Sequence, residues 1–218
     1  MKPNKLLRFA NIFYSLAAGE KLPADSDDLK IILNNIEGLE TYKARKDYAE
    51  KNFERLSSGS SRIVFLTSKK TVIKLAKNDR GLAQNEVEAN PAMNSKHLNK
   101  IISCAKNFSW METYYLDKIN EKEFEEMTGI KFDDFDEAIS YGLQNVSGNT
   151  GKEKPENFDE VSKSDIYKEM KNIGIKFKLM PGDMGRISSF GKKDGHPILI
   201  DAGLSRDVFD KFYEDSSS

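Results

Sequence analysis

The sequence predicts an α+β fold, because the spacing of its apolar residues changes from helical to strand-like and back along the chain. Residues 1–56 show a helical period and predict an N-terminal helical extension. Residues 57–117 contain four short runs of β-branched and aromatic residues around one helical run, which predicts a sheet with one helix. Residues 118–218 are mostly helical, apart from one late strand. We therefore expect a sheet-rich part and a helical part, preceded by the extension.

The composition excludes several classes of protein. With 38% hydrophobic residues the 218-residue chain can bury a core, and 32% charged residues give it a charged surface. Lys plus Arg (34) nearly balances Asp plus Glu (35), so the sequence indicates no nucleic acid partner. No stretch approaches the ~18 consecutive apolar residues of a membrane span. The single cysteine, Cys104, excludes an intrachain disulfide framework, so we expect a protein of the reducing cytoplasm.

The N-terminal extension begins with an amphipathic segment, LLRFANIFYSLAAG. Its apolar residues fall on one broad helical stripe, and Gly19 supplies a stop. Such a helix usually docks on its own domain; the alternative is a helix that docks another protein. Ser26 begins a second helix, and ETYKARKDYAEKNFERL predicts a third helix that reaches Leu56.

The middle part reads as strand, strand, helix, strand, strand. RIVF and TVIKL predict a hairpin with SKK as its turn. Asn78 or Asp79 can cap a helix through GLAQNEVEAN, which Pro91 ends. The segment LNKIISCAKNFSWMETYYLDKI supplies two more strands, separated by a turn at AKN.

The final part contains helical patterns in EKEFEEMTG, FDDFDEAISYGLQN and SKSDIYKEMKNIGIKF. Residues 145–163 are polar and rich in Gly, Asn, Lys and Glu, which predicts a mobile loop. A strand from Pro197 to Ile200 follows a turn at KKDG and ends on Asp201.

Lys74 is the first candidate functional residue, because it lies inside the apolar run Val72–Ala76. Burial of an unpaired ammonium would be costly. Three solutions are open: a nearby carboxylate, the phosphate of a ligand, or a lysine head that reaches water along its apolar stem.

Asp183 and Asp201 form a second candidate group. A hairpin-sized excursion separates them, so the chain can return both carboxylates to one site. Two acids at a cleft suggest a divalent cation or a proton acceptor. Each also has a structural interpretation, since Asp183 suits a turn and Asp201 could cap the next helix.

These residues occur in an order that resembles the protein-kinase-like superfamily, and the catalytic loop is most similar to that of aminoglycoside and choline kinases. The resemblance covers residues 56–210 and implies a compact two-lobed fold, with an antiparallel sheet and helix in one lobe and mostly helices in the other. SSGSSRIVF, with Gly59 and Ser60, stands where the glycine-rich loop would be. TVIK makes Lys74 the phosphate-facing lysine. In QNEVEA either Glu88 or Glu86 would be its helix partner, and the resemblance favours Glu88.

The remaining motifs complete the site that the resemblance implies. WMETYY is similar to the hinge, where the backbone from Glu112 to Tyr114 would meet the adenine of ATP. PGD makes Asp183 the catalytic-loop acid, and LIDAG makes Asp201 the magnesium ligand.

The sequence also departs from the pattern of active kinases. Ser188 stands where an active kinase has a metal-binding Asn, and a hydroxyl is a weaker magnesium ligand than an amide. The loop near residue 59 has a single glycine, and Pro181 replaces the usual His. Arg186 could compensate by clamping a phosphate, or could pair with one of the acids.

Two functions follow from the resemblance. One is an ATP- and magnesium-dependent phosphotransferase of unknown acceptor, with nucleotidyl transfer as a variant. The other is an inactive, pseudokinase-like protein that binds a partner, for example through its N-terminal helix. AKNDRGLAQNEVE, DMGRISSFG and DAGL also resemble kinase-like proteins of large tailed bacteriophages. That likeness implies a protein of the bacterial host cytoplasm, or one packaged in the virion.

Overall fold

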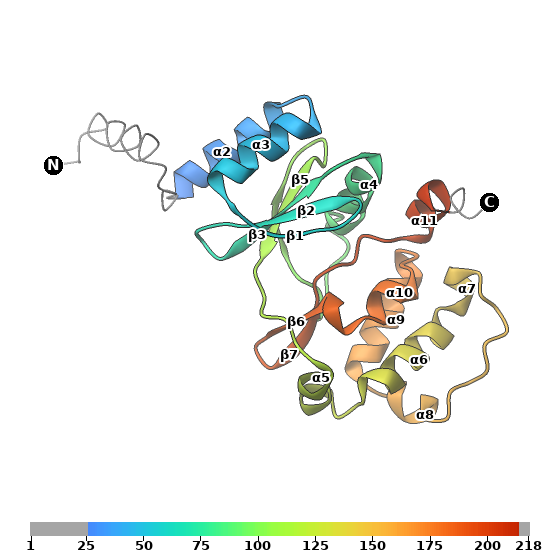
Figure 1. Cartoon of the computed structure of the whole chain (residues 1–218). Coiled ribbons are helices and arrows are strands. Elements are labelled where there is room, and N and C mark those ends of the chain that lie inside the picture. Colours follow the sequence, from blue (N-terminus) through green and yellow to red (C-terminus); the bar gives the residue numbers. More distant parts are fainter. Residues whose placement is uncertain (1–25, 214–218) are drawn as a thin grey trace, which may run out of the picture.

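A five-stranded antiparallel sheet forms the first half of the molecule (Figure 1). The structure is a computed structural model and describes residues 26–213. The strands are β1 (Glu54–Ser58), β2 (Arg62–Leu66), β3 (Thr71–Ala76), β4 (Ile101–Cys104) and β5 (Trp110–Tyr114), in the spatial order β1-β2-β3-β5-β4. Both predicted hairpins are present: β2 pairs with β3, and β4 pairs with β5.

Helices α2 (Ser26–Gly38) and α3 (Tyr42–Asn52) pack on one face of this sheet. Buried residues of α2, such as Leu33 and Ile36, join Phe65 and Ile73 of the strands in one core. Side chains alternate between the two faces of a strand, so the neighbours of these residues point to the opposite face. The helices thus fix which strand residues remain available for a site.

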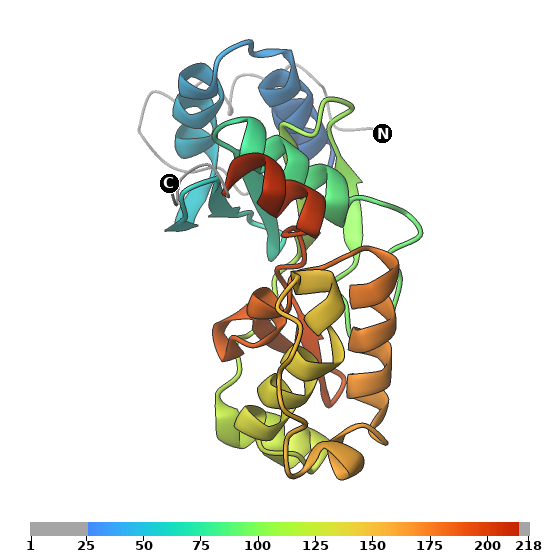
Figure 2. The same cartoon turned by 90° about the vertical axis from the view of Figure 1, so that its right-hand side faces the viewer.

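Helix α4 (Asp79–Glu88) connects β3 to the second hairpin and lies against β3. Of the two predicted caps, Asn78 and Asp79, it is Asn78 that caps the helix, by accepting a hydrogen bond from the backbone N–H of Gly81 at 3.1 Å. A Cβ at Gly81 would lie 2.2 Å from the carbonyl oxygen of Ser61, so only glycine permits this approach of helix to turn. Figure 2 shows α11 (Arg206–Phe212) beside α4, and Arg80 of α4 stacks on the Tyr213 ring at 4.7 Å.

The second half of the chain is mostly helical, so the predicted α+β fold is confirmed. Its helices are α5 (Glu121–Thr128), α6 (Phe132–Gly142), α7 (Gln144–Ser147), α8 (Phe158–Val161), α9 (Asp165–Lys176) and α10 (Pro181–Met184), followed by the 3-10 turn η1 (Ile187–Ser189). A two-stranded hairpin, β6 (Phe190–Lys193) and β7 (His196–Leu199), completes it. The predicted turn at KKDG connects these strands, with Asp194 and Gly195 both at positive φ.

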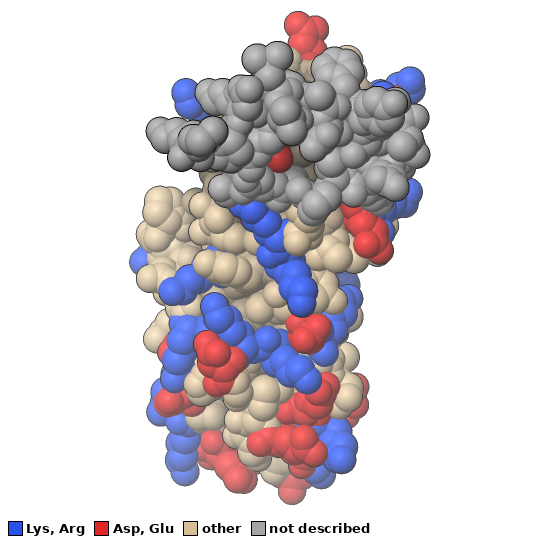
Figure 3. All heavy atoms as spheres, turned by 90° about the vertical axis from the view of Figure 1, so that its left-hand side faces the viewer, with Lys and Arg blue, Asp and Glu red and all other residues tan. Residues whose placement is uncertain are grey.

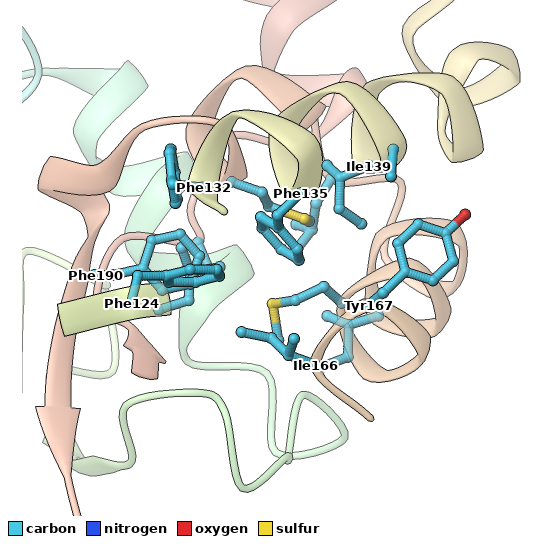
Figure 4. Packing of buried hydrophobic residues seen from close by; sticks show 14 of the residues in the cluster. Phe124, Phe132, Phe135, Ile139, Ile166, Tyr167 and Phe190 are labelled. Carbon is cyan, nitrogen blue, oxygen red and sulfur yellow. The ribbon is translucent and has the colours of Figure 1, made fainter. Parts of the chain in front are cut away.

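Four phenylalanines form the centre of the helical core (Figure 4). Phe124 contacts the rings of Phe132, Phe135 and Phe190, with ring centroids 5.0 Å, 5.2 Å and 5.7 Å away. Because Phe190 begins β6, this core holds the late hairpin against α5 and α6. The segment that follows the hairpin is thereby fixed beneath the sheet.

Three local predictions require correction. The helix expected to reach Leu56 ends at Asn52, and the following residues form β1, so the predicted boundary at residue 56 falls inside a strand. The expected mobile loop 145–163 contains α7 and α8, and Phe158 packs on Tyr141 with ring centroids 4.9 Å apart. The late strand begins at His196 and ends one residue before Ile200. The N-terminal amphipathic segment lies outside the described residues.

The surface carries both signs of charge. On the face drawn in Figure 3, basic and acidic side chains lie side by side over the helical half, in agreement with a net charge of −1. Within residues 26–213, no helix combines the length and apolar character needed to cross a bilayer.

Candidate functional site

A cavity of about 490 Å³ lies between the face of the sheet opposite α2 and α3 and the segments around η1 and β7. Lys74, Asp183 and Asp201, which are far apart in the sequence, all line it. Arg186 and Ser188 line it too. With Tyr114, six of the predicted site residues therefore share one cavity, which lies between the two halves of the molecule.

Lys74 reaches this cavity because of its position in β3. Its neighbours Ile73 and Leu75 point into the core beneath α2 and α3, so Lys74 points to the opposite face. Its ammonium donates hydrogen bonds to Glu88 Oε2 and to the carbonyl oxygen of Ile200, both at 2.6 Å. It also lies 3.8 Å from Asp201 Oδ1. Carboxylates, rather than water, therefore satisfy this lysine, whose side chain is only 8% exposed.

Glu88 is the helix partner of Lys74. It occupies the last turn of α4 on the buried side of the helix, and its side chain is 6% exposed. Its other oxygen, Oε1, accepts a hydrogen bond from Arg62 Nη1 at 2.5 Å. Glu86, the alternative partner considered from the sequence, is exposed.

Arg62 is a member of the site that the sequence did not predict. Its Nη1 lies near Glu88 and Asn85, and its Nη2 donates to the carboxylate of Asp201. The side chain is 8% exposed although it carries a full charge. One signal could have revealed it: Arg62 is two residues before Val64, which pairs with Lys74, so strand alternation places both cations on one face.

Asp201 follows β7 and lies directly beside the two cations. The next residues hold it there: Ala202 is buried, and a Cβ at Gly203 would lie 2.9 Å from Glu88 Oε1. Burial opposes ionisation of Asp201, but the charges of Arg62 and Lys74 outweigh this effect and hold its pKa well below the usual range. The carboxyl group is therefore ionised.

Asp183 lies on the single turn of α10 and has a different environment. Burial and the neighbouring charge of Asp201 raise the pKa of Asp183 to about 6, against a smaller opposing effect of Arg186 and Arg62. At about pH 6 Asp183 is therefore half protonated, whereas Asp201 is ionised. Such a difference suits one carboxylate that holds charge and another that exchanges protons.

The predicted glycine-rich loop takes a different course from the one expected. Gly59 and Ser60 form the turn between β1 and β2, and their carbonyl oxygens accept hydrogen bonds from Lys77 Nζ (2.6 Å) and Asn78 Nδ2 (3.3 Å). The turn is therefore tied toward the start of α4. From this segment, Leu56 and Ser57 of β1 line the cavity instead.

At the predicted hinge, the residues that line the cavity lie further along the chain than expected. Glu112 lies within β5, and its carboxylate accepts hydrogen bonds from the hydroxyls of Thr71 (2.7 Å) and Ser103 (2.9 Å), so it belongs to the sheet. The cavity is lined by the residues that follow, from Thr113 to Leu116, which include the predicted Tyr114. The hydroxyl of Thr113 is buried and has no hydrogen-bond partner among the described residues.

The residues of the site do not fit a divalent cation held by Asp201. The carboxylate of Asp201 already contacts two cationic side chains, Arg62 and Lys74. Ser188 lines the cavity and is exposed, but it supplies only a hydroxyl. Within the described part of the chain, no group of three or more His, Cys, Asp or Glu side chains is placed to hold a metal ion.

Comparisons with known proteins add little to this geometry. No protein-family model matches the chain, and no curated protein matches it. Among solved structures, the chain is similar to the streptomycin–ATP–APH(2")-IIa ternary complex, with 14% sequence identity and a TM-score of 0.31. The match covers 86% of this chain and 74% of the other.

We expect the substitution Glu88→Gln to destabilise the protein strongly. It would leave Arg62 and Lys74 buried with a single carboxylate, and the loss of one partner from a buried ion pair costs about 3 kcal/mol or more. Urea denaturation measures this change. Glu86→Gln is the matched control on the exposed side of the same helix, and we expect a change within about 0.5 kcal/mol. Equal effects of the two substitutions would contradict the role assigned to the buried pair.

A second prediction concerns pH. The pKa of Asp183 is about 6 in the folded protein and 3.8 in the reference state, so the folded state favours the protonated form. The stability that this group contributes is present at low pH and is lost as the pH rises through 6. Asp183→Asn removes this carboxyl group, whose ionisation at high pH destabilises the folded protein. The stability advantage of this variant over wild type should therefore be larger at about pH 8 than at about pH 5, by roughly 1 kcal/mol.

Denaturation midpoints of both proteins at the two pH values test this expectation. Asp133→Asn, at an exposed position of α6, shows whether the loss of any carboxylate gives the same trend. An advantage of Asp183→Asn that does not change with pH would show that Asp183 is ionised throughout this range.

Proposed function

We propose that the chain binds a nucleoside triphosphate in the cavity between its two halves. One observation carries this proposal: a buried lysine, held by a helix glutamate, meets two late carboxylates at a single cavity. This is the arrangement implied by the resemblance to the protein-kinase-like superfamily. The volume of the cavity, about 490 Å³, falls within the range of small-molecule sites.

The lining of the cavity suits both parts of a nucleotide. Leu56, Val64, Val72 and Leu116 supply apolar surface for the base. Lys74 and the exposed Arg186 supply positive charge for the phosphates. A guanidinium can bind a phosphate through two hydrogen bonds at once, which favours Arg186 as the outer phosphate contact.

Transfer of a phosphoryl group is a second candidate function, and Asp183 favours it. Its carboxyl group lines the same cavity, and its pKa of about 6 suits a general base that accepts a proton from an acceptor hydroxyl near neutral pH. The replacement of an amide by Ser188 and the pair formed by Asp201 with Arg62 favour binding without transfer. Nucleotide binding without transfer is therefore the first candidate function.

Calorimetric titration with ATP tests the binding proposal. We expect Arg186→Met and Lys74→Met to weaken binding by about tenfold or more, since each removes a phosphate contact. Arg186→Met is the cleaner variant because this side chain is exposed and lies outside the buried pair. Lys69→Met, in the exposed turn between β2 and β3, is the matched control and should bind like wild type. The absence of ATP binding by the wild-type protein would overturn the proposal.

Incubation with ATP labelled at the γ or the α phosphate separates binding from transfer. A phosphotransferase moves the γ label to an acceptor, and Asp183→Asn should slow this transfer by about a hundredfold or more while ATP binding is kept. A nucleotidyl transferase would move the α label instead. A protein that binds ATP and moves neither label has the binding function alone.

A further inference from the structure

We infer that Arg62 takes the place of a divalent cation at Asp201, so that the cavity binds its nucleotide without a metal ion. The part of this inference that concerns the nucleotide rests on the proposed function. The part that concerns the metal depends only on the contacts of Arg62, Lys74, Glu88 and Asp201.

Four charged side chains form a closed network at the floor of the cavity. Arg62 contacts both carboxylates, with Nη1 on Glu88 and Nη2 on Asp201. Lys74 also contacts both, at 2.6 Å from Glu88 Oε2 and 3.8 Å from Asp201 Oδ1. Each carboxylate therefore has two cationic partners, and each cation has two anionic partners.

The charge of this network explains why a metal ion is not required. Without Arg62, one lysine would face two carboxylates, and the excess negative charge would attract a cation to Asp201. With Arg62 present, two positive and two negative side chains balance. Both cations contact Oδ1 of Asp201, so a divalent cation at this oxygen would have to displace the guanidinium and leave it buried with less compensation, which is costly.

Neighbouring groups hold the guanidinium in place. Asn85 accepts a hydrogen bond from Arg62 Nη1 at 3.3 Å and is itself fully buried. The amide nitrogen of Asn85 donates to the carbonyl oxygens of Lys74 and Phe108, at 3.4 Å and 2.8 Å. The backbone of Arg62 begins β2, whose register to β3 pairs it with Ala76. Arg62 is therefore fixed by the sheet and by α4, and it is not a mobile surface side chain.

The position of Arg62 also leaves the cavity open to a nucleotide. Lys74 and Asp201 line the cavity, whereas Arg62 lies behind them and is 8% exposed. A triphosphate can therefore approach Lys74 and Arg186 while the contact between Arg62 and Asp201 is kept. Arg62 is a positioning residue in this arrangement, because it acts through Asp201 and Glu88 and does not itself meet the ligand.

Binding of Mn²⁺ to the full-length protein without nucleotide tests the metal part directly. Electron paramagnetic resonance reports the free ion, and we expect no saturable site in wild type at millimolar Mn²⁺. Arg62→Met keeps much of the side-chain length and removes the charge, so it should create a site that Asp201→Asn in the same background abolishes. Arg55→Met, in the exposed β1 strand, makes the same change of charge and should create no site.

The nucleotide part is tested by the affinity for ATP with Mg²⁺ and with a chelator. For wild type we expect the two dissociation constants to agree within about threefold, and for Arg62→Met we expect Mg²⁺ to improve binding by about tenfold or more. Wild-type binding that needs Mg²⁺, or a saturable Mn²⁺ site in wild type, would overturn the inference. If no ATP binds under either condition, the proposed function fails, while the Mn²⁺ titration still decides the role of Arg62.

Loss of folding in Arg62→Met would not leave the question open, because the wild-type measurements need no variant. Thermal unfolding of Arg62→Met with and without Mg²⁺ adds a further comparison. We expect Mg²⁺ to raise its melting temperature and to leave that of wild type and Arg55→Met unchanged. An equal response of all three proteins would contradict the inference.

Discussion

The pairing of Lys74 and Arg62 with Glu88 and Asp201 is the interaction on which the arrangement of this protein depends. These residues come from β3, β2, α4 and the segment after β7, so one network joins the sheet, its helix and the helical half. Buried charges tolerate little misplacement, because each must keep its partners. The network therefore fixes how the two halves meet, and the cavity forms where they do.

The alternation of side chains along the strands gives the sheet two distinct roles. One face carries the large apolar residues that pack beneath α2 and α3. The other face carries Arg62, Lys74 and Thr113 together with small apolar side chains such as Val72. Residues that stabilise the core and residues that form the site thus alternate along each strand. The helical extension contributes to the site indirectly, because its core determines which face stays free.

The electrostatics of the cavity also divide between its two acids. Asp201 is ionised and compensated, so it acts as a fixed part of the network. Asp183 forms no comparable ion pair with the residues that the structure describes, and burial together with the charge of Asp201 raises its pKa to about 6. A site of this kind can hold an anionic ligand through Lys74 and Arg186 without a large excess of charge of either sign. It can also exchange a proton at one defined position.

Local sequence determined most of the elements and several members of the site. Hydrophobic period and turn residues predicted both hairpins of the sheet, a cap at Asn78 or Asp79, and the late strand with the turn before it, since these depend on neighbours in the chain. Strand β6, the partner of that late strand, was not predicted. The end of α3 and the start of β1 were missed, because the charged residues after Asn52 suit an exposed helix and an exposed strand equally well. The short helices within 145–163 were not predicted, because contacts of Phe158 with Tyr141 and Tyr167 in the neighbouring helices are not visible in the local sequence.

For the site, the sequence by itself determined the residue types: a lysine within an apolar strand, an acidic helix and two late aspartates. Only the tertiary structure decided the partners. It confirmed Glu88, which the resemblance already favoured over Glu86, as the partner of Lys74. It also showed that residues after Glu112 line the cavity and that Arg62 pairs with Asp201. The physical reason is that the role of a charged residue depends on how deeply it is buried and on which residues it contacts. Both depend on packing between segments that are distant in the sequence, and no local pattern records that packing.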